Sequence, residues 1–345
     1  MKFLPPAIAP LDRRLGAELR ARVDGKAKPP GALGRLEDLA VRIGQIQGRL
    51  DPRVERVRAY VFAGDHGMNA EGVSAYPSAV TGAMVATFLA GKASVNALAR
   101  ACDVEVLVVD AGVDGDLPAH PALLDRKVRR GSRNAAVEAA LSEDELDAAL
   151  AAGAALATDA AKEGVDALVL GEMGIGNSAS AALLMHRLAP ATLVDCIGVG
   201  AGHDAEGLAR KSAVLARAAA RCDSGEPLKV LRQFGGLEIA MMAGAVLGGA
   251  AARRIVVVDG FISSAAALAA IRLVPEVRDY CVFAHASAER GHRLMLEALE
   301  AEPLLNLGLR LGEGTGGVLA APLLRAAARM LSEVASLDDV LAGRL

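Results

Sequence analysis

The sequence has no tryptophan, and aromatic residues make up 3% of its 345 positions, so a core of this size must be built from aliphatic side chains. Its four cysteines, at positions 102, 196, 222 and 281, show no C-x-x-C spacing, which argues against a disulfide framework or a zinc site. We find no run of the roughly 20 strongly apolar residues that a membrane span needs. The first residues, "MKFLPPAIAPLDRR", lack the apolar core of a signal peptide. We therefore expect a cytoplasmic protein without a membrane span.

An excess of positive charge is also missing. Lys and Arg total 38 against 41 Asp and Glu, which gives a net charge of −3. Without a basic stripe or a set of stacking aromatics, a nucleic-acid partner is not expected. Hydrophobic residues make up 53% and charged residues 23%, which is typical of a folded protein.

Short apolar runs rich in Val, Ile and Leu recur along the chain, separated by helical stretches. Nearly continuous runs of this kind are typical of strands buried on both faces, and alternation with helices predicts a mostly parallel sheet. One of the helices should begin at Ser142, with Glu145 completing a capping box, and end near Gly164. The predicted strands lie within residues 57–67, 104–112, 166–174, 192–200, 254–261 and 280–287.

The predicted fold is therefore a three-layer αβα arrangement with a Rossmann-like sheet of about six strands. Residues 51–300 should form this large catalytic domain. The chain termini, 1–50 and 301–345, read as helices that pack together as a small helical domain capping the sheet.

Polar or glycine residues follow each predicted strand. Because open parallel sheets bind ligands at the carboxyl ends of their strands, these residues should line one shared cleft. The residues concerned are Asp65 and His66, Asp110, Glu172, Gly198 and Gly200, Asp259, and His285.

Two glycine-rich turns at this edge have the form of phosphate sites. In "GEMGIGNSASAAL" (171–183) a strand ends, glycines allow close backbone approach, and a helix begins near Ser178. The stretch is neither a P-loop nor a G-x-G-x-x-G motif, and a plain tight turn is the alternative. "GVGAGHD" (198–204) repeats the arrangement, with Lys211 in the following helix, either solvated or close to an anion.

Histidines also lie near strand ends, at positions 66, 203, 285 and 292. They form no H-E-x-x-H or H-x-H cluster, so structural hydrogen bonding is favoured over metal ligation. We expect no metal and no cofactor.

The stretch "LGEGTGG" (311–317) places Glu313 among glycines. The glutamate either holds a turn or faces a ligand as a partly desolvated carboxylate, whose raised pKa suits a general base. Glu172 supplies a second carboxylate at the same edge. Together with the anion turns, these residues favour transfer or hydrolysis on a phosphorylated sugar.

Several long motifs carry a family resemblance over most of the chain. The motifs are "KPPGALGRLEDLA" (28–40), "GDHGMNAEGVSAYPSAVT" (64–81), "LGEMGIGNSASAA" (170–182), "GVGAGHD" (198–204), "VVDGFISSAAAL" (257–268), "AHASAERGH" (284–292) and "LNLGLRLGEGTGG" (305–317). In this order they resemble nicotinate-nucleotide–dimethylbenzimidazole phosphoribosyltransferase, an enzyme of cobamide lower-ligand synthesis.

The resemblance implies that nicotinate mononucleotide gives its phosphoribosyl group to dimethylbenzimidazole, with inversion at the anomeric carbon. Glu313 would be the general base that takes the azole proton, and Glu172 a second active-site carboxylate. The resemblance also implies a homodimer.

By position, the resemblance further places the phosphate on Gly174, Gly176, Asn177, Ser178 and Gly202, with Lys211 and Ser287 nearby. The azole should contact Tyr76 and Leu311. Ala83 stands where many family members have Gln, which leaves the preferred base open among dimethylbenzimidazole, benzimidazole, a purine and a phenol.

Two other functions fit part of the sequence. A nicotinamide-dependent oxidoreductase would suit the sheet, but no G-x-G-x-x-G follows the first strand. A non-catalytic nucleotide-sensing module would bind a nucleotide and leave Glu313 without a role.

Overall fold

The computed structural model describes residues 2–198, 202 and 204–345. Their centre is one parallel sheet with the strand order β3-β2-β1-β4-β5-β6. The strands are β1 (Val57–Gly64), β2 (Glu105–Gly112), β3 (Leu123–Asp125), β4 (Ala167–Met173), β5 (Ile255–Val258) and β6 (Cys281–Phe283).

The direction of strand addition reverses at the middle of the sheet. Strand β1 pairs with β2 on one side, where Val61 is opposite Val108, and with β4 on the other, where Val61 is opposite Gly171. In open α/β sheets the crevice outside this reversal is the usual ligand site. A ligand site is therefore expected at the carboxyl ends of β1 and β4.

Helices connect the strands and cover the sheet. They are α1 (Arg13–Asp24), α2 (Arg35–Gln47), η1 (Gly67–Glu71), α3 (Ala79–Leu89), α4 (Ser94–Ala101), α5 (Glu143–Lys162), α6 (Asn177–Leu188), α7 (Leu193–Cys196), α8 (Ala205–Ala219), α9 (Pro227–Phe234), α10 (Leu237–Ala251), α11 (Phe261–Leu273), η2 (Pro275–Tyr280), α12 (His292–Ala298), α13 (Thr315–Glu333) and α14 (Leu337–Leu341). The capping box predicted for α5 is confirmed, since Ser142 and Glu145 exchange hydrogen bonds with each other's backbone.

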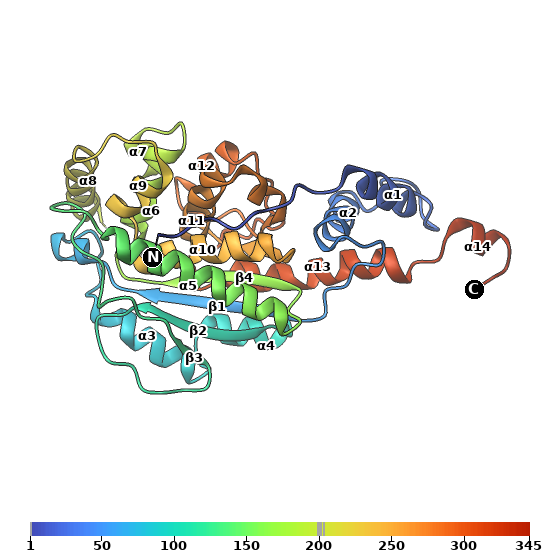
Figure 1. The fold of residues 1–345 in the computed structure, drawn as a ribbon, viewed down its shortest axis with the longest axis horizontal. Coiled ribbons are helices and arrows are strands. Elements are labelled where there is room, and N and C mark those ends of the chain that lie inside the picture. The colour runs from blue at the N-terminus through green and yellow to red at the C-terminus, as the bar shows by residue number, and fades with distance from the viewer. Residues whose placement is uncertain (1, 199–201, 203) are drawn as a thin grey trace.

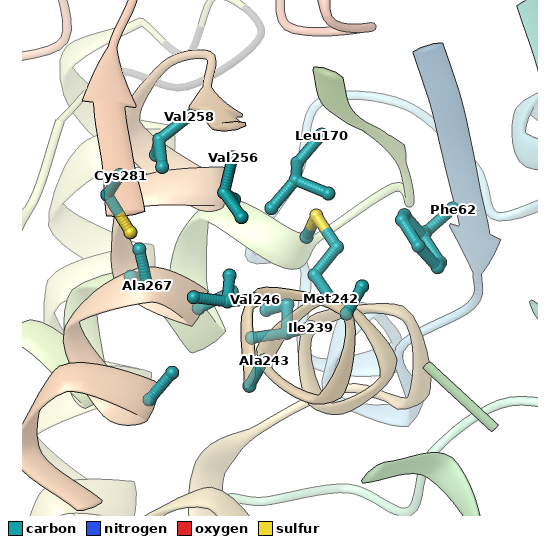
Figure 2. Close-up of a cluster of buried hydrophobic side chains, with 14 of the residues drawn as sticks. Phe62, Leu170, Ile239, Met242, Ala243, Val246, Val256, Val258, Ala267 and Cys281 are labelled. Atoms are coloured by element: carbon teal, nitrogen blue, oxygen red, sulfur yellow. The ribbon is translucent and has the colours of Figure 1, made fainter. Parts of the chain in front are cut away.

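Helices α10 and α11 pack on one face of the sheet, and α3, α4 and α13 pack on the other (Figure 1). Helix α10 is apolar all round and almost wholly buried, as a helix between a sheet and an outer helix must be. Figure 2 shows Ile239, Met242 and Val246 of α10 facing Leu170 of β4 and Val256 of β5. The three-layer αβα fold predicted from the sequence is confirmed.

Helix α5 forms an outer layer over α10, and glycines allow the two backbones to touch. A Cβ placed on Gly153 would lie 1.8 Å from the carbonyl oxygen of Met241, and one on Gly244 would lie 2.1 Å from that of Leu150. Any larger residue would therefore separate the helices.

One predicted strand is wrong. Within 192–200, the structure forms the short helix α7, whose first turn is capped by the Thr192 side chain accepting from the backbone N–H of Asp195. Val194 is 66% exposed, which a strand buried on both faces would not allow. Gly198 therefore does not end a strand, and Gly200 lies outside the described residues. The sixth strand is instead β3, a three-residue edge strand.

The terminal helices lie together at one end of the molecule (Figure 1). Helix α2 packs on α1 and on α13, and α13 also runs along β4. A separate small helical domain of residues 1–50 and 301–345 stays a prediction.

Residues 79–101 are long and apolar enough to cross a membrane by length and composition alone. In the structure this stretch is two helices, α3 and α4, of 11 and 8 residues, separated by a turn in which Gly91 has a φ of +69°. Each is shorter than the roughly 20 residues of a membrane span.

Candidate active site

A cavity of about 730 Å³ opens at the carboxyl edge of the sheet, at the reversal between β1 and β4. Four carboxylates line it: Glu172, Asp259, Glu289 and Glu313. The turn after β4 and a mostly apolar group of side chains form its other walls. That apolar group is Val73, Tyr76, Val80, Met84, Met173, Leu309 and Leu311.

The turn after β4 contains Gly174, Gly176 and Asn177 and leads directly into α6. A Cβ on Gly174 would lie 2.4 Å from the carbonyl oxygen of Gly64, and Gly176 has a φ of +95°. Both positions therefore require glycine. Among the described residues no side chain caps the helix at Gly176, so the positive end of the α6 dipole faces the cavity. This is the geometry of an anion site.

Lys211 of α8 reaches this turn, although its side chain is only 1% exposed. Its Nζ donates hydrogen bonds to Oγ of Ser178 at 3.0 Å and to the carbonyl oxygen of Gly198 at 3.2 Å. Burial lowers the pKa of Lys211 to about 8, and the nearby charge of Glu289 opposes that shift. The lysine is thus a buried cation next to the turn, and the solvated alternative is wrong.

Ser287 also lines the cavity. Its backbone N–H donates to Nδ1 of His292 at 2.8 Å, and Nε2 of that ring lies 2.9 Å from Oγ of Ser264. Burial lowers the pKa of His292 to about 3, so the ring is neutral and acts as a fixed support for the Ser287 loop.

Glu172, the penultimate residue of β4, is buried beside the turn. Its Oε2 accepts a hydrogen bond from the side-chain amide of Asn177. Burial raises the pKa of Glu172 to about 8; the Asn177 hydrogen bond opposes the shift, and the charges of Asp259, Glu238 and Glu313 add to it. At neutral pH the carboxyl is protonated and has a hydrogen to donate.

Glu313 lies in the loop before α13 and is 5% exposed. One carboxylate oxygen accepts a hydrogen bond from the backbone N–H of Val95 at 3.3 Å, at the N-terminus of α4. Burial raises its pKa, the bond from Val95 opposes this, and the charge of Asp259 adds to it. A raised pKa in a carboxylate that faces a cavity is what a general base requires.

The structure brings most of the predicted residues together. Those that line the cavity are Glu313, Glu172, Gly174, Gly176, Asn177, Ser178, Ser287, Tyr76 and Leu311, with Lys211 one hydrogen bond behind Ser178.

Besides Lys211, two predicted residues do not line the cavity. Gly202 is exposed, in a loop whose neighbours 199–201 and 203 lie outside the described residues. Ala83 is exposed on α3, while its neighbours Val80 and Met84 face the cavity. The Ala83 side chain is therefore not part of the cavity wall.

Sequence reasoning placed Asp259 and His285 at the shared cleft but assigned a role to neither, and both line the cavity. Their signal was their place at strand ends. The prediction of one shared cleft is wrong for Asp65, His66, Asp110 and Gly198, which do not line it. Sequence reasoning missed Glu238 of α10, whose Oε1 lies 2.6 Å from Nε2 of His66 beside the turn. Glu238 is the one charged residue in the otherwise apolar stretch 237–251, and this pattern could have indicated it.

The described histidines show no metal cluster: no group of three His, Cys, Asp or Glu side chains in the described ranges could hold an ion. His66 bonds to Glu238 and to Oγ of Ser180, and His292 to Ser264, which is the predicted structural use. The prediction is wrong for His285, because neither of its buried ring nitrogens has a hydrogen-bond partner among the described residues. His203 lies outside the described residues.

The chain is similar to known proteins over nearly its whole length. A family model described as phosphoribosyltransferase matches residues 8–340. The chain is thus a phosphoribosyltransferase, a pentosyl-transferring enzyme, and the oxidoreductase alternative is not supported.

Individual relatives narrow the class. The nicotinate-nucleotide–dimethylbenzimidazole phosphoribosyltransferase of Cupriavidus necator is 52% identical over 332 residues, covering 96% of each chain. The protein of that name from Deinococcus radiodurans is 49% identical, covering 96% of this chain and 93% of its own. The crystal structure of CobT from Thermus thermophilus superposes with a TM-score of 0.90 at 47% identity, covering 95% of this chain and 98% of its own. The chain belongs to the nicotinate-nucleotide–dimethylbenzimidazole phosphoribosyltransferase family.

Proposed function

We propose that this enzyme transfers the phosphoribosyl group of nicotinate mononucleotide to dimethylbenzimidazole, giving α-ribazole phosphate and nicotinate for cobamide synthesis. The observation that carries the proposal is the position of Glu313. Its buried carboxylate lines the same cavity as the N-terminus of α6, which has a buried lysine behind it.

The nucleotide phosphate belongs at the α6 end. The turn at Gly174, Gly176 and Asn177 offers backbone approach and the positive helix end, and Ser178 and Ser287 offer hydroxyls. Lys211 adds a positive charge once protonated, and phosphate binding raises its pKa and favours that form. Gly202 stays a further phosphate contact by resemblance alone.

The acceptor base belongs at the apolar end, against Tyr76 and Leu311. A benzimidazole is a weak neutral nucleophile, so loss of its N–H proton is the step that most needs help. Glu313 takes that proton as the other ring nitrogen attacks the anomeric carbon, which is worth about 10²–10⁴-fold for a positioned base. Holding both reactants in line in one cavity supplies much of the remaining acceleration.

Departure of the leaving group needs no comparable catalytic help. The nicotinate ring of the mononucleotide is a pyridinium, which leaves as a neutral ring nitrogen without an acid or a metal. Attack from the opposite face inverts the anomeric carbon. Glu172, protonated at neutral pH, serves as a hydrogen-bond donor to the substrate between the two ends rather than as a second base.

We also infer a cytoplasmic homodimer. Helix α3 is apolar but buries only Thr81, Val85 and Phe88, and Tyr76 and Leu311 at the cavity mouth are 48% and 54% exposed. A second copy over this face would cover both the helix and the mouth. Sedimentation velocity tests the dimer, and a monomer at micromolar concentration would contradict it.

The direct test of function is nicotinate release. The protein is incubated with nicotinate mononucleotide and dimethylbenzimidazole in the presence of a chelator, and the products are followed by chromatography and mass spectrometry. Release of nicotinate with formation of α-ribazole phosphate is expected. Tight nucleotide binding without product from any azole, purine or phenol would instead indicate a nucleotide-sensing module.

A further inference from the structure

The carboxylate of Asp259 lies at the N-terminus of α13. The N-cap residue of this helix, Gly314, directly follows Glu313 in the sequence. Oδ1 of Asp259 accepts a hydrogen bond from the backbone N–H of Gly317 at 2.8 Å, and Oδ2 accepts from that of Gly314 at 3.2 Å. Asp259 itself follows β5 and is 1% exposed. The segment after β5 and the N-terminus of α13 are thus joined by a carboxylate whose two oxygens each accept a hydrogen bond.

This bond replaces a local cap. The N-cap residue of α13 is Gly314, which has no side chain to accept from the first helical N–H groups. Asp259 performs that role from the position after β5 and places a carboxylate at the positive end of the helix. The glycine amides of "LGEGTGG" therefore hold a protein carboxylate, and the phosphate is left to the α6 turn.

The backbone that carries Glu313 needs such a support. Gly312, Glu313 and Gly314 have φ angles of +82°, +64° and +87° in succession. For a residue with a Cβ this left-handed conformation is strained and persists only where the surroundings fix it. The bond at Gly314 is one of the contacts that hold the glutamate in this conformation.

The other side of the loop is already closed. Gly171 of β4 packs so tightly that a Cβ there would lie 2.4 Å from the carbonyl oxygen of Glu313. A Cβ on Gly316 would lie 2.0 Å from the His285 ring. The loop is therefore held between β4, His285 and the carboxylate of Asp259, and only the last of these holds it through hydrogen bonds to its backbone N–H groups.

We propose that Asp259 is a positioning residue for Glu313: its two hydrogen bonds to Gly314 and Gly317 fix the general base at the acceptor end of the cavity. The inference rests on the proposed function, in which Glu313 takes the azole proton. It predicts that loss of the carboxylate harms proton abstraction more than nucleotide binding.

The test compares Asp259→Asn with Asp110→Asn. Asparagine at 259 has one oxygen, so one backbone N–H must face an NH₂ group. Asp110 is a matched control: it is also buried at a strand end, and it accepts from the backbone N–H of Val113 at 2.9 Å, but it does not line the cavity. Each variant is assayed with benzimidazoles whose ring substituents make the N–H progressively more acidic.

For Asp259→Asn, kcat with dimethylbenzimidazole should fall about 10²-fold, within the range for a positioned base, while KM for nicotinate mononucleotide stays within about threefold. The loss should shrink as the acceptor N–H becomes more acidic, as it should for Glu313→Gln. Amide hydrogen exchange over 313–318 should accelerate, and Asp110→Asn should show neither effect. If Asp259→Asn does not fold, Asp259→Ser, which reaches only one N–H, is measured in its place.

A loss of equal size for every acceptor, a loss confined to nucleotide KM, or unchanged exchange over 313–318 would overturn the proposal. Failure of the proposed function looks different. In that case the wild-type protein releases no nicotinate with any acceptor, or Glu313→Gln turns over as fast as wild type, while the exchange result for Asp259→Asn still reports on the loop.

Discussion

Glu172 packs directly against the backbone of Gly312. A Cβ placed on Gly312 would lie 2.2 Å from Oε1 of Glu172, so no side chain fits between them. Because Gly312 precedes Glu313 in the sequence, Glu172 packs against the backbone next to Glu313. The positions of the two active-site glutamates are therefore coupled through Gly312.

Gly312→Ala should break this relationship. The new Cβ would displace Glu172 and strain a φ of +82°, so kcat should fall at least about tenfold, and stability by about 1–3 kcal/mol, the usual cost of a strained φ. Gly31→Ala is the matched control, since its φ is +75° and nothing lies within 4 Å of its Cβ position. Equal activities for the two variants in a nicotinate-release assay would show that the contact has no role.

Much of the fold follows from local pattern. The strands β1, β2, β4, β5 and β6 coincide with apolar runs because strands buried on both faces leave few polar positions. The error at 192–200 came from the same rule: a Thr-x-x-Asp cap outweighed the apolar content and formed α7. Strand β3 has three residues and is only half-buried, so it leaves no pattern to find.

The parts of the site that residue types and short motifs indicate were predictable from the sequence. The parts that depend on tertiary packing were not. Glycines and a lone glutamate indicated the α6 turn and Glu313. The capping of α13 by Asp259 joins residues 55 and 58 positions apart, and no local spacing encodes such a bond. The burial of Lys211 likewise depends on how α8 meets the turn after β4.

Glu172→Gln should stabilise the protein in a pH-dependent way. The folded-state pKa of about 8 lies above the unfolded value near 4.5, so wild-type stability falls between those values as the unfolded carboxyl ionises and the folded one does not. The gain should be small at pH 4.5 and on the order of 4 kcal/mol at pH 8, at about 1.4 kcal/mol per pKa unit. Thermal melts at both pH values measure it, with exposed Glu18→Gln as control. A gain that is the same at both pH values would contradict the prediction.

Lys211 should make nucleotide binding depend on pH. Its pKa of about 8 means that it loses its charge as pH rises through that value, so KM for nicotinate mononucleotide should increase severalfold between pH 7 and 9.5. Lys211→Met should bind the nucleotide more weakly at pH 7 and lose this dependence. A KM profile that rises equally in the variant would assign the effect to another group.

The central claim is that Glu313 removes the proton of the acceptor base, and Glu313→Gln tests it most directly because the substitution preserves shape and removes basicity. Steady-state nicotinate release with dimethylbenzimidazole should fall about 10²–10⁴-fold in kcat, while calorimetric affinity for nicotinate mononucleotide stays within about threefold of wild type. Turnover at the wild-type rate would contradict the account.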